Sequence, residues 1–163
     1  MDVMALQARE ILPSDLRFLR EMLYQAVFIG PGEKRPPKSI VADPSLAIYI
    51  GGWGRPGDCG LIASLDREPL GAAWARLFTP KNPGFGWIDE KTPEISMAIA
   101  EGHRNQGLGS FLLGQLLDRL AECGFDRASL SVDPRNPALR LYKRYGFHDV
   151  GITGRALTLL RDL

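Results

Sequence analysis

The sequence predicts an α/β (α+β) fold in which one sheet contains both antiparallel and parallel strands. Two apolar segments, residues 60–64 and 70–78, flank a polar turn at residues 66–68, which is the pattern of an antiparallel hairpin. Residues 94–100 form a short, uninterrupted apolar segment typical of a central strand. Further along the chain, helical and strand patterns alternate. Both kinds of connection are therefore expected in one mixed sheet.

The amino-terminal part is predicted to contain one strand and two helices. Alternation of apolar and polar side chains over residues 4–9 indicates the strand. The first helix has Ser14 in the capping position, and its apolar side chains recur at three- and four-residue spacing at Leu16, Leu19, Leu23 and Val27. Residues 43–49 can form a short second helix, whereas residues 51–58 are too rich in glycine for a regular element.

The carboxyl-terminal part has the most regular apolar spacing. Leucines at helical intervals predict the longest helix at residues 108–120, ending near Gly124. A strand, a helix that stops at Gly146 and a closing pair of strands follow, at residues 128–132, 136–145, 147–152 and 156–160. No internal repeat is visible, and residues 1–163 are expected to form a single domain.

Composition narrows the range of partners. The chain has 163 residues, and 45% of them are hydrophobic, which is enough for one core. Lysine and arginine total 20 against 19 acidic residues, which argues against nucleic acid or an anionic membrane as the main partner. No apolar leader or membrane-spanning segment is apparent, so a cytoplasmic protein is expected. Cys59, Cys123 and two histidines give no support for a metal site or a disulfide, and Cys123 is predicted to be buried.

Residues 104–109 lie where a strand leads into a helix, a position suited to binding phosphate oxygens. Gly107 and Gly109 lack side chains that would block an anion, and Arg104 supplies a charged donor. A tight turn with a solvated arginine explains these residues equally well. Two other phosphate-binding loops are excluded: no lysine followed by serine or threonine comes after the second glycine, and Leu112 stands where a dinucleotide fingerprint needs glycine or alanine.

Two sequence motifs make the chain resemble the GNAT acetyltransferase superfamily. Residues 104–109 (RNQGLG) match its R/Q-x-x-G-x-G/A acetyl-CoA signature, which also lies between a strand and a helix. Residues 136–147 (NPALRLYKRYGF) resemble a second family segment, with an asparagine, a Leu-Tyr pair and a closing Gly-Phe. The resemblance covers residues 94–151 closely and the rest of the chain by the order of its elements.

The resemblance implies the GNAT fold, which is a mixed, mostly antiparallel sheet of six to seven strands with about four helices and two splayed central parallel strands. The V-shaped slot between those strands would hold the pantetheine arm of acetyl-CoA, the co-substrate. Three parts of the chain would bind it: backbone groups at the end of the strand at residues 94–100, the pyrophosphate-binding loop at residues 104–109, and the helix at residues 136–145. The expected residues are Ile99, Ala100, Arg104, Asn105, Gln106, Gly107, Leu108, Gly109, Ser110, Asn136 and Tyr142.

Acetyl transfer needs an uncharged amine, a positioned carbonyl and an acid for the departing thiolate. Direct attack in a ternary complex is the usual route in the family, and Tyr142 matches the tyrosine often assigned as the acid. Glu94 opens the central strand on the same face as Ser96 and Ala98, so it is the candidate base, acting directly or through water. The structural alternatives are packing of Tyr142 against the sheet and a surface position for Glu94.

The acceptor is expected to be a primary amine of a small molecule or peptide. The resemblance implies a pocket shaped by the first two helices and by residues 24–37, 51–58 and 84–94. Aromatic and acidic residues that could line it are Trp53, Trp74, Phe85, Trp87, Asp58, Asp89 and Glu90. Attachment of long loops to the core by the tryptophans is an equally good interpretation. The alternative function is an acetyl-CoA-binding sensor with little transferase activity. A homodimer is compatible with the family.

Overall fold

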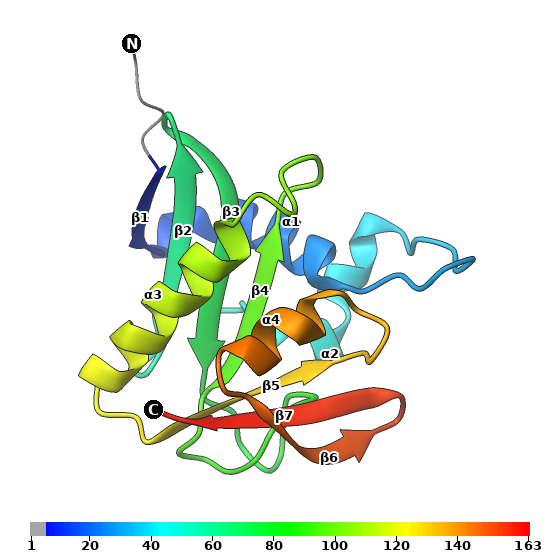
Figure 1. Cartoon of the computed structure of the whole chain (residues 1–163), viewed down its shortest axis with the longest axis vertical. Coiled ribbons are helices and arrows are strands. Elements are labelled where there is room, and N and C mark those ends of the chain that lie inside the picture. Colours follow the sequence, from blue (N-terminus) through cyan, green and yellow to red (C-terminus); the bar gives the residue numbers. More distant parts are fainter. Residues whose placement is uncertain (1–5) are drawn as a thin grey trace.

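A computed structural model of the chain describes residues 6–163 (Figure 1). Within that range, seven strands form one sheet in the order β1-β2-β3-β4-β5-β7-β6. Neighbouring strands are antiparallel except β4 and β5, which are parallel, so the predicted mixed sheet is confirmed. The strands are β1 (Leu6–Glu10), β2 (Cys59–Leu65), β3 (Glu68–Arg76), β4 (Glu94–Ile99), β5 (Arg127–Val132), β6 (His148–Thr153) and β7 (Ala156–Asp162).

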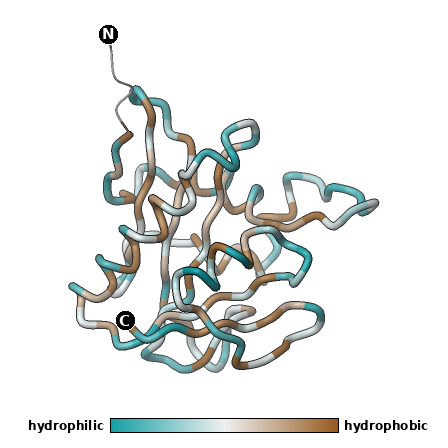
Figure 2. The backbone as a smooth tube through the Cα atoms, viewed as in Figure 1, coloured by the Kyte–Doolittle hydropathy of each residue, from teal (hydrophilic) through white to brown (hydrophobic). Residues whose placement is uncertain are grey.

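Helices cover both faces of the sheet. α3 packs on β2, β3 and β4 from one side, and α1 packs on β3 and β4 from the other (Figure 1). Apolar segments lie along the central strands between these helices (Figure 2). None of the helices in residues 6–163 is long and apolar enough to cross a membrane. The helices are α1 (Leu16–Ala26), α2 (Pro44–Ala47), α3 (Leu108–Glu122) and α4 (Ala138–Arg144), with short 3-10 turns η1 (Pro13–Asp15) and η2 (Lys38–Ala42).

β2 and β3 form the predicted hairpin. Its turn residues Asp66 and Arg67 have φ values of 50° and 70°, as a two-residue turn that follows the strand twist requires. β3 then pairs with β4 in continuous register, which places Arg76 opposite Glu94. The candidate base therefore lies beside a buried arginine in the sheet.

The parallel strands β4 and β5 part almost at once. Their register contains one pair, Glu94 with Ser129, next to a hydrogen bond of 3.0 Å from the Ser129 N–H to the Pro93 carbonyl. Beyond this point β4 stays paired with β3, while β5 stays paired with β7. The expected splay is therefore present, and it opens toward the carboxyl ends of the two strands.

Two local predictions are wrong. Ser14 does not cap α1, because Pro13 starts a separate 3-10 turn and Asp15 becomes the residue before the helix. Cys123 is exposed rather than buried, because α3 ends at Glu122 and the helical spacing no longer applies to it. The predicted first strand is present from Leu6 onward, and its earlier residues lie outside the described range.

A buried ion pair fixes the glycine-rich segment before β2. The Arg76 side chain is 1% exposed, and its guanidinium donates to both carboxylate oxygens of Asp58 at 2.9 and 2.8 Å. The same guanidinium donates to the carbonyls of Ile48 at 2.9 Å and Gly51 at 2.7 Å. Because a buried charge without partners is costly, Arg76 and Asp58 together determine the path of this segment.

Arg76→Met is expected to lower the free energy of unfolding by about 3–5 kcal/mol, because Asp58 would stay buried without its partner. Urea denaturation measures this loss. The double variant Arg76→Met, Asp58→Asn should lose less than Arg76→Met alone. As a control, Arg9→Ala breaks a more exposed pair with Asp15 and should cost less than about 1 kcal/mol. Equal losses for the two single variants would contradict the assignment.

Candidate active site

The loop between β4 and α3 leaves its backbone open to an anion. Asn105 and Gly107 both have positive φ, 62° and 84°, and Gly107 is the residue before the helix. A Cβ on Gly107 would meet no atom within 4 Å, so the backbone conformation and not packing favours glycine there. In the described chain no side chain caps α3 and no acidic residue lies in its first turn. The first N–H groups of α3 are therefore suited to a negatively charged group.

The first residues of α3 fix the helix to the core. Leu108 is buried in the cluster on the α3 side of the sheet. A Cβ on Gly109 would lie 3.2 Å from Leu141 of α4 and 3.4 Å from Met97 of β4. Gly109 thus lets α3 approach both elements closely, which is a packing role that the sequence motif did not reveal.

Arg104 turns back from the loop toward the sheet and α1. Its Nε donates to the Ile99 carbonyl at 3.3 Å, and its Nη2 donates to Oε1 of Gln25 at 3.1 Å. The side chains of Asn105 and Gln106 are exposed. The structure therefore brings the end of α1 next to the loop, a contact that the sequence motifs did not indicate.

The backbone groups at the end of β4 differ in their bonding within the protein. The Ala100 N–H donates to the Leu70 carbonyl at 2.7 Å, and the Ala100 carbonyl accepts from the His103 N–H at 3.0 Å. Both backbone groups of Ala100 are thus engaged within the protein. Alternation along the strand directs the backbone groups of Ile99 toward β5. The Ile99 carbonyl already accepts from Nε of Arg104 at 3.3 Å, so the Ile99 N–H is the group best placed for the expected amide contact.

Two other expected cofactor residues have contacts within the protein. Oδ1 of Asn136 accepts from the Ala138 N–H at 2.9 Å, which leaves the Asn136 side-chain NH₂ as the free donor. The Ser110 hydroxyl lies 2.8 Å from the Tyr145 hydroxyl, which also donates to the Ser110 carbonyl at 2.9 Å. Ser110 therefore joins α3 to the end of α4.

Tyr142 lies on the α3 side of the splayed strands. It is buried in the cluster that also contains Ile95 of β4 and Val132 of β5, and its ring meets Phe147 edge-on at 6.1 Å between centroids. Burial raises the pKa of the Tyr142 phenol to about 12. This phenol is therefore protonated at neutral pH and can donate a proton.

Glu94 lies on the opposite, α1 side of the sheet and is 3% exposed. Its Oε1 accepts from the Gly86 N–H at 3.0 Å, and its Oε2 accepts from the Tyr49 hydroxyl. That hydroxyl in turn accepts from the Phe85 N–H at 2.8 Å. Burial raises the pKa of Glu94 to about 7, and the bonds from Tyr49 and Gly86 partly oppose this rise. The alternative of a surface position for Glu94 is therefore wrong.

Two glycines allow the loop before β4 to close over this carboxylate. A Cβ on Gly84 would lie 2.2 Å from Oε1 of Glu94, and a Cβ on Gly86 would lie 2.6 Å from the backbone of Leu130 in β5. Side chains at these positions would push the loop away. The Gly-Phe-Gly sequence at residues 84–86 is consistent with this close approach. The contact with Tyr49 has no such signal, because Tyr49 is 45 residues from Glu94 and no sequence pattern connects the two.

The residues predicted to line the acceptor pocket fall into two groups, one in the interior and one near the surface. Trp74 is fully buried and its indole N–H donates to the Tyr49 carbonyl at 3.1 Å. Trp53 is also buried and bonded to a backbone carbonyl, and Asp58 is paired with the buried Arg76. The polar side-chain atoms of these three residues are bonded within the protein, and all three side chains are enclosed. Their predicted place in the acceptor pocket is wrong.

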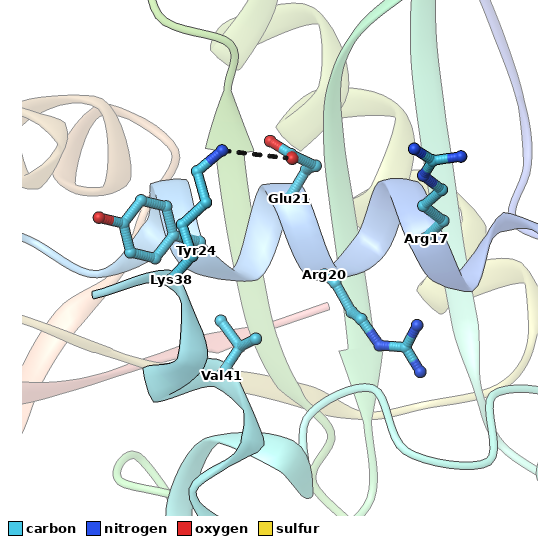
Figure 3. Close-up of a pocket in the computed structure, with 6 residues that line it drawn as sticks. All are labelled: Arg17, Arg20, Glu21, Tyr24, Lys38 and Val41. Carbon is cyan, nitrogen blue, oxygen red and sulfur yellow. Dashed lines mark ion pairs between the residues drawn. The ribbon is translucent and has the colours of Figure 1, made fainter. Parts of the chain in front are cut away.

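The other four pocket residues remain near the surface. Phe85 is 48% exposed and stacks on the Tyr49 ring at 6.4 Å. Trp87, Asp89 and Glu90 line a cavity of about 440 Å³ together with Pro80 and Lys91. A separate cavity of about 240 Å³ lies between α1 and η2 (Figure 3), and its lining residues are Arg17, Arg20, Glu21, Tyr24, Lys38 and Val41.

Comparison with known proteins identifies the family. Residues 21–147 match the family model described as the acetyltransferase (GNAT) family. The chain belongs to this family. A mycothiol acetyltransferase of Clavibacter sepedonicus is 37% identical over 89 residues, which are 52% of the chain and 29% of that protein. One from Corynebacterium aurimucosum is 38% identical over 76 residues, 42% of the chain and 25% of that protein.

The GNAT fold extends over the whole described chain. A phosphinothricin acetyltransferase from Sinorhizobium meliloti, solved in complex with AcCoA, has a TM-score of 0.69 at 22% identity. The match covers 97% of this chain and 88% of that structure. The chain spans less than a third of the two mycothiol acetyltransferases, so their names identify no substrate here.

The buried Glu94 of this GNAT chain is expected to make stability depend on pH. Its pKa is about 7 in the folded protein against an ordinary value of 4.5, so the folded state holds the proton more tightly between these values. Stability should therefore fall as pH rises from about 4.5 to 7, on the order of 3 kcal/mol from this group. Denaturation at several pH values should show a smaller fall for Glu94→Gln. An unchanged pH dependence would contradict the burial of an ionisable Glu94.

Proposed function

We propose that this GNAT chain transfers an acetyl group from acetyl-CoA to a primary amine of a small molecule or peptide, by direct attack in a ternary complex. The observation that carries the proposal is the splay of β4 and β5 next to the loop at residues 104–107 and the uncapped start of α3 at Leu108. A slot between strands suits an extended arm with amides, and a helix N-terminus suits a diphosphate. The S. meliloti acetyltransferase of similar fold was solved with AcCoA, which supports the same ligand here.

The cofactor would use backbone groups along the slot and the loop. The N–H groups from Asn105 to Ser110 would face the diphosphate, with Arg104 and Gln106 as side-chain donors. The backbone of Ile99 and the side-chain NH₂ of Asn136 would bond the pantetheine arm from the two sides. The Ala100 N–H already bonds the Leu70 carbonyl, so Ala100 would offer the arm only the second lone pair of its carbonyl.

The candidate acid and base lie on opposite faces of the sheet. Tyr142 belongs to the cluster on the α3 side, and Glu94 lies on the α1 side where the two strands begin to part. In direct attack the amine approaches one face of the thioester while the sulfur departs from the carbonyl carbon. A base on the amine side and an acid on the cofactor side therefore match the two proton transfers.

Proton transfer at each residue follows from its environment. Glu94 has a pKa of about 7, so it is substantially ionised near neutral pH and can accept a proton from the amine. Because its carboxylate is enclosed by Tyr49 and Gly86, it would act through a water molecule. Tyr142 keeps its proton until the thiolate forms and then donates it to sulfur.

Free thiol release from acetyl-CoA, measured over a panel of polyamines, amino acids, aminoglycosides and peptides, tests the function. Transfer predicts thiol release that depends on one class of amine and matches the acetylated product in amount. Binding of acetyl-CoA without turnover of any amine would support a sensor instead. A thermal shift with acetyl-CoA separates these outcomes from a protein that does not bind the cofactor.

Tyr142→Phe is expected to lower kcat about a hundred- to ten-thousandfold, which is the usual contribution of a general acid. Tyr145→Phe is the matched control, because it also removes one tyrosine hydroxyl at the end of α4. The hydroxyl of Tyr145 bonds Ser110. The control should retain most of its activity. Similar rates for wild type and Tyr142→Phe would leave Tyr142 with a packing role only.

Glu94→Gln is expected to remove the rise in kcat that wild type shows as pH increases through about 7, because a general base must be ionised to act. Deprotonation of the amine itself should still raise the rate at higher pH. The pH profile of both proteins checks this. If Glu94→Gln keeps the rise near pH 7, the base is another group.

A further inference from the structure

A second guanidinium lies beside Arg104. Arg35 belongs to the segment between α1 and η2, and its Nη2 donates to Oε1 of Gln25 at 3.0 Å. Nη2 of Arg104 donates to the same oxygen at 3.1 Å. One amide oxygen therefore holds two cationic groups that come from distant parts of the sequence.

Arg35 and Arg104 together carry more positive charge than the acidic side chains near them neutralise. Arg35 forms an ion pair of 3.4 Å with Glu101, but the two side chains are 44% and 72% exposed, so solvent weakens the pair. Within residues 6–163, Arg104 makes no ion pair, and its side chain bonds only neutral oxygens. Two guanidinium groups held together repel each other, and a bound anion would relieve this repulsion.

Arg35 is held in place before any ligand binds. Its guanidinium lies 5.1 Å from the centre of the Tyr24 ring, and the Tyr24 hydroxyl donates to the Pro36 carbonyl at 2.6 Å. Tyr24 and Gln25 belong to the last turn of α1, which packs against β4 (Figure 1). The end of α1 thus fixes Arg35 beside Arg104, where the loop at residues 104–109 begins. Less conformational entropy of the Arg35 side chain would then be lost when an anion binds.

We propose that Arg35 is a second diphosphate-binding residue of the acetyl-CoA site, acting together with Arg104 and the N–H groups at the start of α3. The proposal rests on the proposed function. Gln25 is a positioning residue, because its single oxygen orients both guanidinium groups and leaves each with further N–H donors for phosphate oxygens. Arginine suits this role because its planar group can donate two parallel bonds to a phosphate.

Equilibrium binding to Arg35→Ala tests the proposal with three ligands. These are acetyl-CoA, its form without the 3′-phosphate, and acetyl-pantetheine, which has no diphosphate. Arg35→Ala should raise Kd about five- to tenfold for the first two ligands and leave the third unchanged. Added salt should weaken acetyl-CoA binding more in wild type than in Arg35→Ala. Arg20→Ala is the matched control, since it removes an exposed arginine from the α1–η2 cavity and should change no Kd.

Each other result overturns the assignment. Equal losses for acetyl-pantetheine would mean that Arg35→Ala distorts the slot. A loss confined to the ligand with the 3′-phosphate would place Arg35 at that phosphate. Similar losses in Arg35→Ala and Arg20→Ala would reflect general surface charge, and no loss at all would exclude a contact. Failure of wild type to bind acetyl-CoA would refute the proposed function itself, which distinguishes the two failures.

Discussion

The separation of β4 from β5 after a single residue pair, Glu94 with Ser129, is the constraint on which the rest of the site depends. Each strand keeps one antiparallel neighbour, so the sheet remains stable while its two inner edges diverge. Backbone groups on such edges need partners, and an extended ligand can supply them. The loop that contains residues 104–109 follows one of these strands, and the loop leading to α4 follows the other.

Buried polar groups hold the closed end of this gap. Arg76 and Glu94 are opposite each other in register, yet each bonds elsewhere, Arg76 to Asp58 and Glu94 to Tyr49 and Gly86. Because Asp58 neutralises Arg76, Glu94 gains no compensating cation, and burial raises its pKa. One arrangement therefore fixes two loops and gives a carboxylate a pKa suited to proton transfer near neutral pH.

Features that depend on local spacing could be predicted from the sequence. The leucines of α3, the hairpin turn and the strand that begins at Glu94 follow such spacing. The motifs at residues 104–109 and 136–147 together indicated the family that the family model confirms. Contacts between distant segments could not be predicted. Enclosure of Glu94 by Tyr49, burial of Trp74 and the approach of Arg35 to Arg104 all depend on how the helices and loops pack. Ser14 failed as a cap because Pro13 formed its own turn.

We propose that acetyl-CoA binds in the gap between β4 and β5. A crystal structure of the chain with acetyl-CoA tests this most directly. We expect the pantetheine arm between β4 and β5, hydrogen-bonded to the backbone of Ile99, with the diphosphate on residues 104–109. A cofactor bound outside this gap would refute this binding mode, as would β4 and β5 paired along their length so that no arm could enter.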